Sequence, residues 1–440
     1  MIIVEVQPMF YRHLLFLVLL IGNAYRIIRR VIIDSQQKKP LPEEVKDIYT
    51  PEKYQDFLNH EHDYLPLFIA ARIINIALNG FYIYSPYYLW MEKLGRGNAY
   101  LIMLATVLSS ELLSVIFSLP RSWYATFTIE EKYGLNRQTK KDFIKDEMLS
   151  VLTSLFASIA LYSFIIFVTQ KLSMHIEARE VSYAYVFGLM AIVIIISVIV
   201  IFGIAIIAYL IQRRQYSYRD LEEGELRNKI IALTQGAKKK VRRIEVYDES
   251  KKSNSKNAYL LTILWYRAFG IADNYLDENS ERELLAVLSH EAGHLKHRKD
   301  LLDYSRYLLI VIVLIVFALV LPHAELIDGI VNNINQAYGL SISNYVLLMS
   351  YVSALMSPLS FFAGIAMNFV SRRNETEADL NAVKEGYGEE LIQTFRQMST
   401  DELIDVNPSP VIEFLEYDHP SIVKRIRTIR EALKIQNMHA

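Results

Sequence analysis

The feature that most constrains the fold of this chain is a series of long apolar segments. A helix needs about 20 apolar residues to cross a bilayer core of about 30 Å, because it rises about 1.5 Å per residue. Seven segments approach that length, near residues 9–28, 65–90, 99–119, 148–168, 183–211, 305–322 and 345–370. The sequence therefore predicts an α-helical integral membrane protein with seven spans in contact with the lipid bilayer.

Composition narrows the chemistry that the chain can use. Hydrophobic residues make up 52% of the sequence, there is no cysteine, and the net charge is −1. Without cysteine the chain has neither a disulfide frame nor a thiolate metal site, so a metal must be held by histidines and carboxylates. A nearly neutral chain has no general attraction for nucleic acid, which is therefore not an expected partner.

The loop charges predict the orientation of the spans. Lys and Arg are dense after spans one, three, five and seven, whereas residues 322–344, between spans six and seven, contain none. Because cytoplasmic loops carry the excess of Lys and Arg, the N-terminus is expected outside or in the lumen and the C-terminus in the cytoplasm. Arg26, Arg29 and Arg30 follow the first apolar run in place of a small-residue cleavage signal, which favours a retained span over a removed signal peptide.

Two polar stretches lie on the predicted cytoplasmic side. Residues 212–304 combine helical spacing at 221–234 with strand-forming residues at 244–247 and 258–263. Together with residues 371–440 they predict a small α+β domain that is split in sequence by two spans. The expected organisation is spans one to five at 1–211, the first part of the domain at 212–304, spans six and seven at 305–370, and the second part at 371–440.

The segment His290-Glu291-Ala292-Gly293-His294 fits the pattern H-E-x-x-H. Residues four apart lie on one face of a helix, so both imidazoles can reach one ion. Glu291 would act as the catalytic base toward the water that the metal activates. The small residues Ala292 and Gly293 would let a neighbouring element approach the helix closely.

A third protein ligand is needed, with a fourth position left open for water. The candidates are in Ser371–Asp379, a segment with helical character that follows the last span. Glu375 and Asp379 share a helical face, so Asp379 could orient a ligand imidazole through a hydrogen bond. Spacing alone does not choose between Glu375 and Glu377, and both also suit a solvated helix surface.

The chain resembles the integral-membrane CaaX prenyl proteases of the zinc-dependent type I, which include the a-factor-processing and prelamin-processing enzymes. The resemblance extends over nearly the whole chain. It rests on Leu119–Tyr124, Phe127–Asn136, Asn257–Tyr259, the H-E-x-x-H segment, Glu375–Asp379, His419-Pro420 and Arg425. It implies seven helices around an intramembrane chamber and one Zn²⁺ per chain, held by His290, His294 and Glu375.

The resemblance also implies roles around the metal. Asp379 would support a ligand histidine, and His419 would stabilise the oxyanion. Asn257 and Ala258 would bind substrate at an edge strand, where unpaired backbone groups can pair with a peptide. Arg425 is grouped with them, although a structural role is favoured over a catalytic one.

Polar residues inside the predicted spans are a further signal. They would be costly facing lipid, so they are expected to face an interior or a water-filled space. Contacts between packed helices would satisfy them equally well. These residues are Arg72, Asn75, Asn79, Glu111 and Asn368.

The favoured function is a membrane-embedded zinc metalloendopeptidase, expected as a monomer. In a eukaryote it would cut prenylated C-terminal CaaX peptides at the endoplasmic reticulum membrane. In a bacterium it would remove membrane or misfolded proteins at the cytoplasmic membrane, and Leu295, where eukaryotic relatives carry an aromatic residue, keeps that alternative open. A transporter or structural membrane protein with incidental histidines is the alternative from another class.

Overall fold

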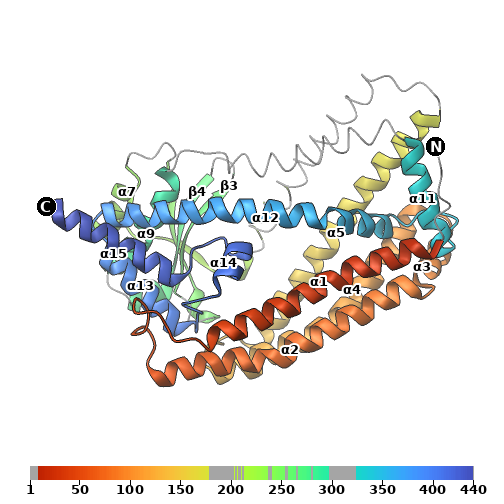
Figure 1. Cartoon of the computed structure of the whole chain (residues 1–440). Coiled ribbons are helices and arrows are strands. Elements are labelled where there is room, and N and C mark those ends of the chain that lie inside the picture. The colour runs from red at the N-terminus through yellow and green to blue at the C-terminus, as the bar shows by residue number, and fades with distance from the viewer. Residues whose placement is uncertain are drawn as a thin grey trace.

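The structure, a computed structural model, combines long helices with a compact part that contains a small sheet (Figure 1). It describes residues 8–177, 203, 206, 210, 213–235, 240–252, 256–263, 266–278, 281–296 and 324–439. The predicted sixth span at 305–322 lies outside the described residues, as does the predicted fifth span at 183–211 apart from three positions.

Four helices among the described residues are long and apolar enough to cross a membrane. They are α2 (Pro51–Tyr84), α4 (Ala99–Tyr124) with its π-helical continuation η1 (Ala125–Glu130), α5 (Lys140–Glu177) and α12 (Tyr345–Lys384). Helix α1 (Pro8–Gln37) contains the first predicted span and is 30 residues long, but it is not one of these four. The short helices α3 (Tyr87–Gly95) and α11 (Ala324–Tyr338) complete the helical part.

The predicted span at 65–90 is wrong in its C-terminal boundary, because α2 ends at Tyr84. Pro86 has no N–H to donate and disfavours a helical conformation at the residue before it. Ser85 is accordingly extended, with φ −84° and ψ 170°, and α3 starts after Pro86. The apolar run is thus divided between two helices.

Helix α12 connects the two parts of the molecule, as Figure 1 shows. The side chain of Asn344 caps its first turn by accepting hydrogen bonds from the N–H groups of Val346 and Leu347. Pro358 leaves the carbonyl of Ala354 without its usual helical donor, and the Ser357 hydroxyl donates to that carbonyl at 2.8 Å. The helix therefore continues for 40 residues, past the predicted boundary at 370–371.

The sheet has four strands in the order β1 (Tyr218–Asp220), β2 (Arg243–Tyr247), β4 (Tyr266–Ala272) and β3 (Ala258–Ile263). The pair β2–β4 is parallel, whereas β1–β2 and β3–β4 are antiparallel. Strand β3 is therefore at an edge of the described sheet. The Tyr259 ring lies on Gly270 of β4, where a Cβ atom would come within 2.3 Å of the ring, so this pairing requires glycine.

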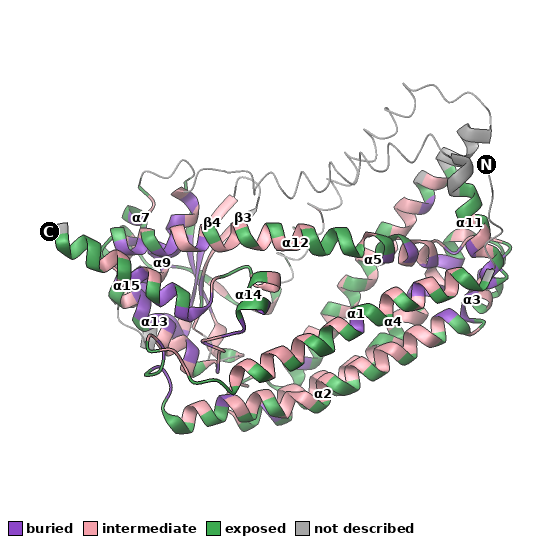
Figure 2. Cartoon of the chain, in the orientation of Figure 1, coloured by how far each residue is buried: buried purple, intermediate pink, exposed green. Residues whose placement is uncertain are grey.

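Among the described residues, the compact part also contains six helices and two apolar cores. The helices are α7 (Glu225–Leu233), α8 (Asp273–Glu278), α9 (Glu281–Lys296), α13 (Gly388–Asp401), α14 (Pro410–Glu416) and α15 (Ile422–His439), with a 3₁₀ turn η2 (Glu249–Lys251). The first core packs Phe269 and Ile271 of β4 against Leu284 and Leu288 of α9. Buried residues concentrate in this compact part, as Figure 2 shows.

The second core joins the compact part to the beginning of the membrane helices. Val45 and Tyr49, which precede α2, and Phe57 within it pack with Phe395 of α13 and Ile426 of α15. The Tyr49 hydroxyl also donates to the carbonyl of Ile404 at 2.8 Å. The entrance to α2 is therefore fixed to the C-terminal helices.

The long helices expose apolar side chains along their length. Examples are Ile28 on α1, Ile73 on α2, Leu112 on α4 and Leu152 on α5, each more than half exposed. Exposed apolar surface of this extent marks a membrane or protein contact. It fits an α-helical integral membrane protein with a small mixed domain.

Candidate metal centre

Helix α9 carries the two histidines on one face. Its first turn contains Glu281 and Glu283, whose carboxylates suit the positive end of the helix dipole. Gly293 allows α12 to approach, because a Cβ there would lie 2.8 Å from the Cα of Ala378. The Asn381 side chain of α12 donates to the carbonyl of Ser289 at 2.8 Å, which fixes the two helices to each other.

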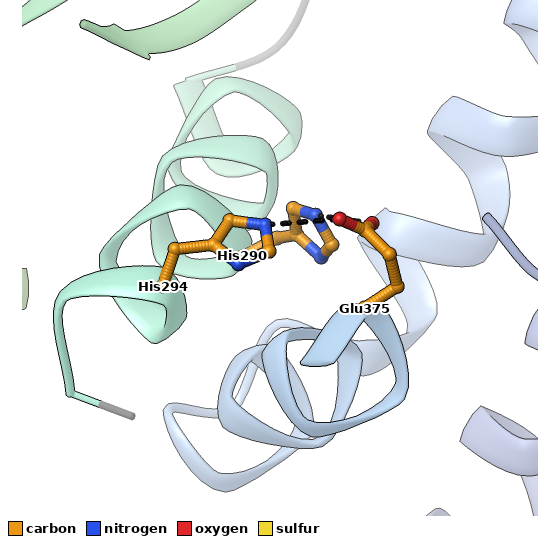
Figure 3. A group of neighbouring side chains, drawn as sticks. All are labelled: His290, His294 and Glu375. Carbon is orange, nitrogen blue, oxygen red and sulfur yellow. Dashed lines mark ion pairs between the residues drawn. The ribbon is translucent and has the colours of Figure 1, made fainter. Parts of the chain in front are cut away.

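Glu375 of α12 faces both histidines, as Figure 3 shows. Its Oε2 lies 3.3 Å from Nε2 of His290, and its Oε1 lies 3.3 Å from Nε2 of His294. His290 and Glu375 are each only 6% exposed. Glu377, the other candidate from the sequence, is instead paired with Arg373 at 3.1 Å and has a side chain 41% exposed.

The three side chains have the donor atoms and the spacing that a metal ion needs. One ligand atom from each lies within 4.8 Å of the others. Two atoms bound about 2.0–2.1 Å from a tetrahedral ion are about 3.4 Å apart, close to the observed separations. Buried Oε2 of Glu375 has no hydrogen-bond partner in the described structure, so an acceptor is left for a cation.

Asp379 fixes the orientation of His290. Its Oδ1 accepts from Nδ1 of His290 at 2.8 Å, which leaves Nε2 directed at Glu375. Burial disfavours the charged imidazole, yet the nearby carboxylates of Asp379 and Glu375 raise the pKa of His290 to about 9. The space between the carboxylates of Asp379 and Glu375 therefore stabilises a positive charge.

Arg425 of α15 compensates the buried carboxylates. Its Nη2 and Nε donate to the two oxygens of Asp379 at 2.7 and 2.9 Å, and Nη2 lies 3.7 Å from Oε2 of Glu375. The guanidinium also lies over the Phe395 ring, 4.1 Å from its centroid. Burial alone would lower the pKa of Arg425, but Asp379 raises it, so the side chain stays charged.

Replacing Arg425 by methionine should destabilise the protein by about 3–5 kcal/mol, because a buried carboxylate then loses its partner. The matched control is Arg427→Met on the same helix, where the pair with Glu44 is largely exposed, with an Arg427 side chain 51% exposed. Breaking such a surface pair costs about 0–1 kcal/mol. Thermal unfolding of the detergent-solubilised chain measures both, and equal losses of stability would contradict the structural role of Arg425.

His419 reaches the same site from the loop between α14 and α15. Its Nε2 lies 3.4 Å from Oε1 of Glu375, and its Nδ1 contacts Asp418 at 2.8 Å. Unlike His290, its side chain is 54% exposed. It is therefore accessible to a molecule that enters the site.

Glu291 is held by the edge strand. Its Oε2 accepts from the N–H of Leu260 in β3 at 3.1 Å. This N–H points away from β4, so Glu291 occupies one donor on the outer edge of β3. Asn257 directly precedes β3 and accepts from the N–H of Ala272 through its carbonyl, with its side chain exposed, whereas Ala258 is buried.

Sequence reasoning missed two features of this site. The first is the contact of Glu291 with Leu260, which depends on how β3 docks against α9 and has no signal in spacing. The second is the pairing of Asp379 with Arg425, two residues that the sequence singled out separately. Their separation of 46 positions gave no reason to join them.

Two family models match consecutive parts of the chain. A model described as the CAAX prenyl protease N-terminal region with five membrane helices matches residues 32–211. A model of peptidase family M48 matches residues 220–433. The second range contains every residue of the site described above.

Curated relatives and a solved structure agree with these matches. The CAAX prenyl protease 1 homolog of Arabidopsis thaliana is 26% identical over 317 residues, which cover 72% of this chain and 70% of the relative. The homolog of Dictyostelium discoideum is 27% identical over 411 residues, covering 90% and 91%. The crystal structure of S. mikatae Ste24p has the same fold, with a TM-score of 0.73, 19% identity, and coverage of 95% of this chain and 99% of that one.

Proposed function

Because the chain belongs to peptidase family M48, as a membrane metalloprotease of the CAAX prenyl protease 1 type, we propose that it hydrolyses a peptide bond near the C-terminus of prenylated CaaX proteins. The observation that carries this proposal is the convergence of His290, His294 and Glu375 from two packed helices. The relatives' names supply the substrate class. Membership of a peptidase family favours hydrolysis over the transporter or structural alternative.

The metal of this metalloprotease is proposed to be one Zn²⁺ per chain, held by His290, His294 and Glu375. Two imidazoles and one carboxylate are a known ligand set of catalytic zinc, and the chain has no cysteine to offer. When bound, zinc would polarise the substrate carbonyl and make water a better nucleophile at neutral pH. Asp379 would keep His290 in the tautomer that leaves Nε2 free.

Glu291 is proposed as the general base. It is adjacent to a ligand histidine and is held by the Leu260 N–H at one carboxylate oxygen. The other oxygen is then available to take a proton from the attacking water and to return it to the leaving amine. His419, exposed at the site, would donate to the developing oxyanion, a contribution worth about 3–4 kcal/mol in comparable sites.

The free edge of β3 is proposed to bind the substrate backbone. Strand β3 is an edge strand in the described sheet, and such an edge offers unpaired N–H and C=O groups to an extended peptide. Asn257 and Ala258 lie where this strand begins. The division into membrane segments and a two-part domain, at 211–212, 304–305 and 370–371, is part of the same proposal.

Seven spans around a chamber, with the metal centre on the cytoplasmic side, form the proposed membrane arrangement. The alternation of basic loops supports it, because Lys and Arg mark cytoplasmic loops. In a eukaryote the protein would lie in the endoplasmic reticulum membrane, and in a bacterium in the cytoplasmic membrane. A monomer is part of the same proposal.

A cleavage assay with two peptides tests the proposed substrate. A farnesylated CaaX peptide and its unprenylated twin are compared with the full chain in detergent. We expect the farnesylated peptide to be cleaved with the higher kcat/KM, cleavage to stop after metal chelation, and stoichiometric Zn²⁺ to restore it. Equal cleavage of both peptides would contradict the prenyl requirement and favour the quality-control alternative. Chelator-resistant cleavage would contradict the metal site.

A further inference from the structure

A basic cavity lies beside the metal centre and is not part of it. Its volume is about 500 Å³, within the usual range for small-ligand sites of about 300–1,000 Å³. It is bounded by α1, α2, the junction of α4 with the π-helical turn η1, and the segments around Asp405 and Tyr417. Four arginines line it, and they are Arg29, Arg30, Arg72 and Arg121.

Two of these arginines are neutralised by the chain and two are not. Arg29 contacts Glu416, and Arg30 donates to Glu61 at 2.6 Å. Arg72 has buried Nε and Nη1 atoms without a hydrogen-bond partner among the described residues, although its guanidinium lies 5.6 Å from the Phe68 ring centroid. Arg72 as a whole is only partly buried, so its guanidinium can be reached from the cavity, and its two buried N–H donors are left for an anion that enters it.

Of the four arginines that line the cavity, Arg121 is the second that has no carboxylate partner among the described residues. It lies one turn before η1, a π-helical turn of six residues whose Ala125 also lines the cavity. Such turns are rare and frequently occur at functional sites. Of the two acids that line the cavity, Glu61 is already paired with Arg30, and Asp405 accepts from the N–H of Asn407 at 3.0 Å and forms no ion pair with Arg72 or Arg121 in the described structure. The cavity therefore retains unpaired positive charge.

The depth of Arg72 argues against a lipid headgroup as the anion. Two exposed aromatic residues, Tyr84 where α2 ends and Trp90 on α3, occupy a position typical of the membrane interface. Arg72 precedes Tyr84 by twelve residues (84 − 72), which is about 18 Å along the helix axis. That depth is inside a hydrocarbon core of about 30 Å, where phosphate groups of bilayer lipids do not lie.

The cavity begins close to the reacting groups. Tyr417 lines it and is two residues from His419, at most about 7 Å of extended chain. Arg372, one turn before Glu375 on α12, donates to the carbonyl of Tyr417 and also, at 3.0 Å, to that of Glu413. A bond cut within a C-terminal tetrapeptide lies at most three residues, or about 10 Å, from the terminal carboxylate. Aliphatic side chains would meet the apolar wall formed by Ile33, Leu67, Phe68, Ala71 and Ala125.

We propose that Arg72 and Arg121 bind the α-carboxylate of the substrate's C-terminus, so that the cavity measures the distance from the chain end to the scissile bond. The inference rests on the proposed function and specifies which group of the substrate the protease recognises. Arginine suits this task because its planar guanidinium can bind a carboxylate through two parallel hydrogen bonds. An endopeptidase with this anchor would prefer a free C-terminal acid.

The test compares one farnesylated CaaX peptide as the free acid and as the C-terminal amide. Charge-assisted hydrogen bonds of this kind correspond to about a 10- to 100-fold difference, so we expect kcat/KM for the acid to exceed that for the amide by this factor. Arg72→Gln and Arg121→Gln should lower kcat/KM for the acid and leave the amide unchanged. Arg427→Gln, at an exposed pair on α15, should keep the wild-type ratio.

A binding measurement separates this proposal from the proposed function. Full-length Glu291→Gln protein is titrated with the labelled acid and amide peptides, which reports recognition without turnover. Tighter binding of the acid supports the anchor even if the wild-type chain cleaved neither peptide. Equal binding in this background, or an unchanged acid-to-amide ratio in Arg72→Gln, would overturn it. An unchanged ratio with loss of co-purified anionic phospholipid from Arg72→Gln would also overturn it and assign the cavity to a lipid headgroup.

Discussion

Replacing Glu291 by glutamine is expected to lower kcat/KM by about 10²- to 10⁴-fold, the usual contribution of a positioned acid–base group. Glutamine has nearly the same shape and can still accept from the Leu260 N–H through its carbonyl oxygen, so the geometry of the site is preserved. It cannot take a proton from water. Zinc content by mass spectrometry of the purified protein should therefore stay unchanged while cleavage is lost.

The control for this substitution is Glu281→Gln on the same helix. Glu281 is exposed and pairs with Lys229 at 2.7 Å at the opposite end of α9. Losing that pair should cost about 0–1 kcal/mol of stability and leave kcat/KM close to that of wild type, because Glu281 lies away from the reacting groups. Full residual activity of Glu291→Gln, or an equal loss in both variants, would refute the general-base assignment.

Replacing Glu375 by glutamine should remove the metal itself. The amide has no charge to offset a divalent cation, and buried Oε2 is the atom that lacks a partner in the described structure. Changes to groups behind metal ligands already cost about 10- to 100-fold in affinity, so loss of a ligand should weaken zinc binding by more than about 100-fold. Metal analysis after dialysis against a weak chelator measures this loss.

Glu377→Gln provides a control that the sequence itself suggests. The two glutamates are two positions apart on α12, and spacing alone did not distinguish them. Glu377 pairs with Arg373 and has a side chain 41% exposed, so its replacement should leave zinc content and cleavage close to wild type. If the metal followed Glu377 and not Glu375, the proposed ligand set would be wrong.

Local patterns predicted the elements that carry the site. The strands at 244–247 and 258–263 and the helix through His290 could be recognised from residue type, periodicity and caps. Gly293 was expected to permit a close neighbour, and it packs on Ala378 of α12. The choice of Glu375 over Glu377 came from resemblance, because helical spacing presents both as possible ligands.

Features that depend on docking could not be predicted. Nothing near Arg425 in the sequence indicates Asp379 as its partner, and nothing near Leu260 indicates Glu291. The division of the second apolar run at Ser85 depends on Pro86, a local signal that was outweighed by hydropathy. The unpaired state of Arg72 is a property of three packed helices, although its presence in an apolar segment already marked it as unusual.

The uninterrupted course of α12 has a mechanical consequence. A straight helix of 40 residues is about 60 Å long, so a small tilt that adapts its apolar part to a thinner or thicker bilayer displaces its far end by several ångströms. Because α9 is fastened to that end by the Gly293–Ala378 contact and the Asn381–Ser289 hydrogen bond, the histidines travel with the carboxylate. A change in bilayer thickness would then move the ligand residues of α9 and α12 together relative to the surrounding elements, without distorting the geometry of the metal site.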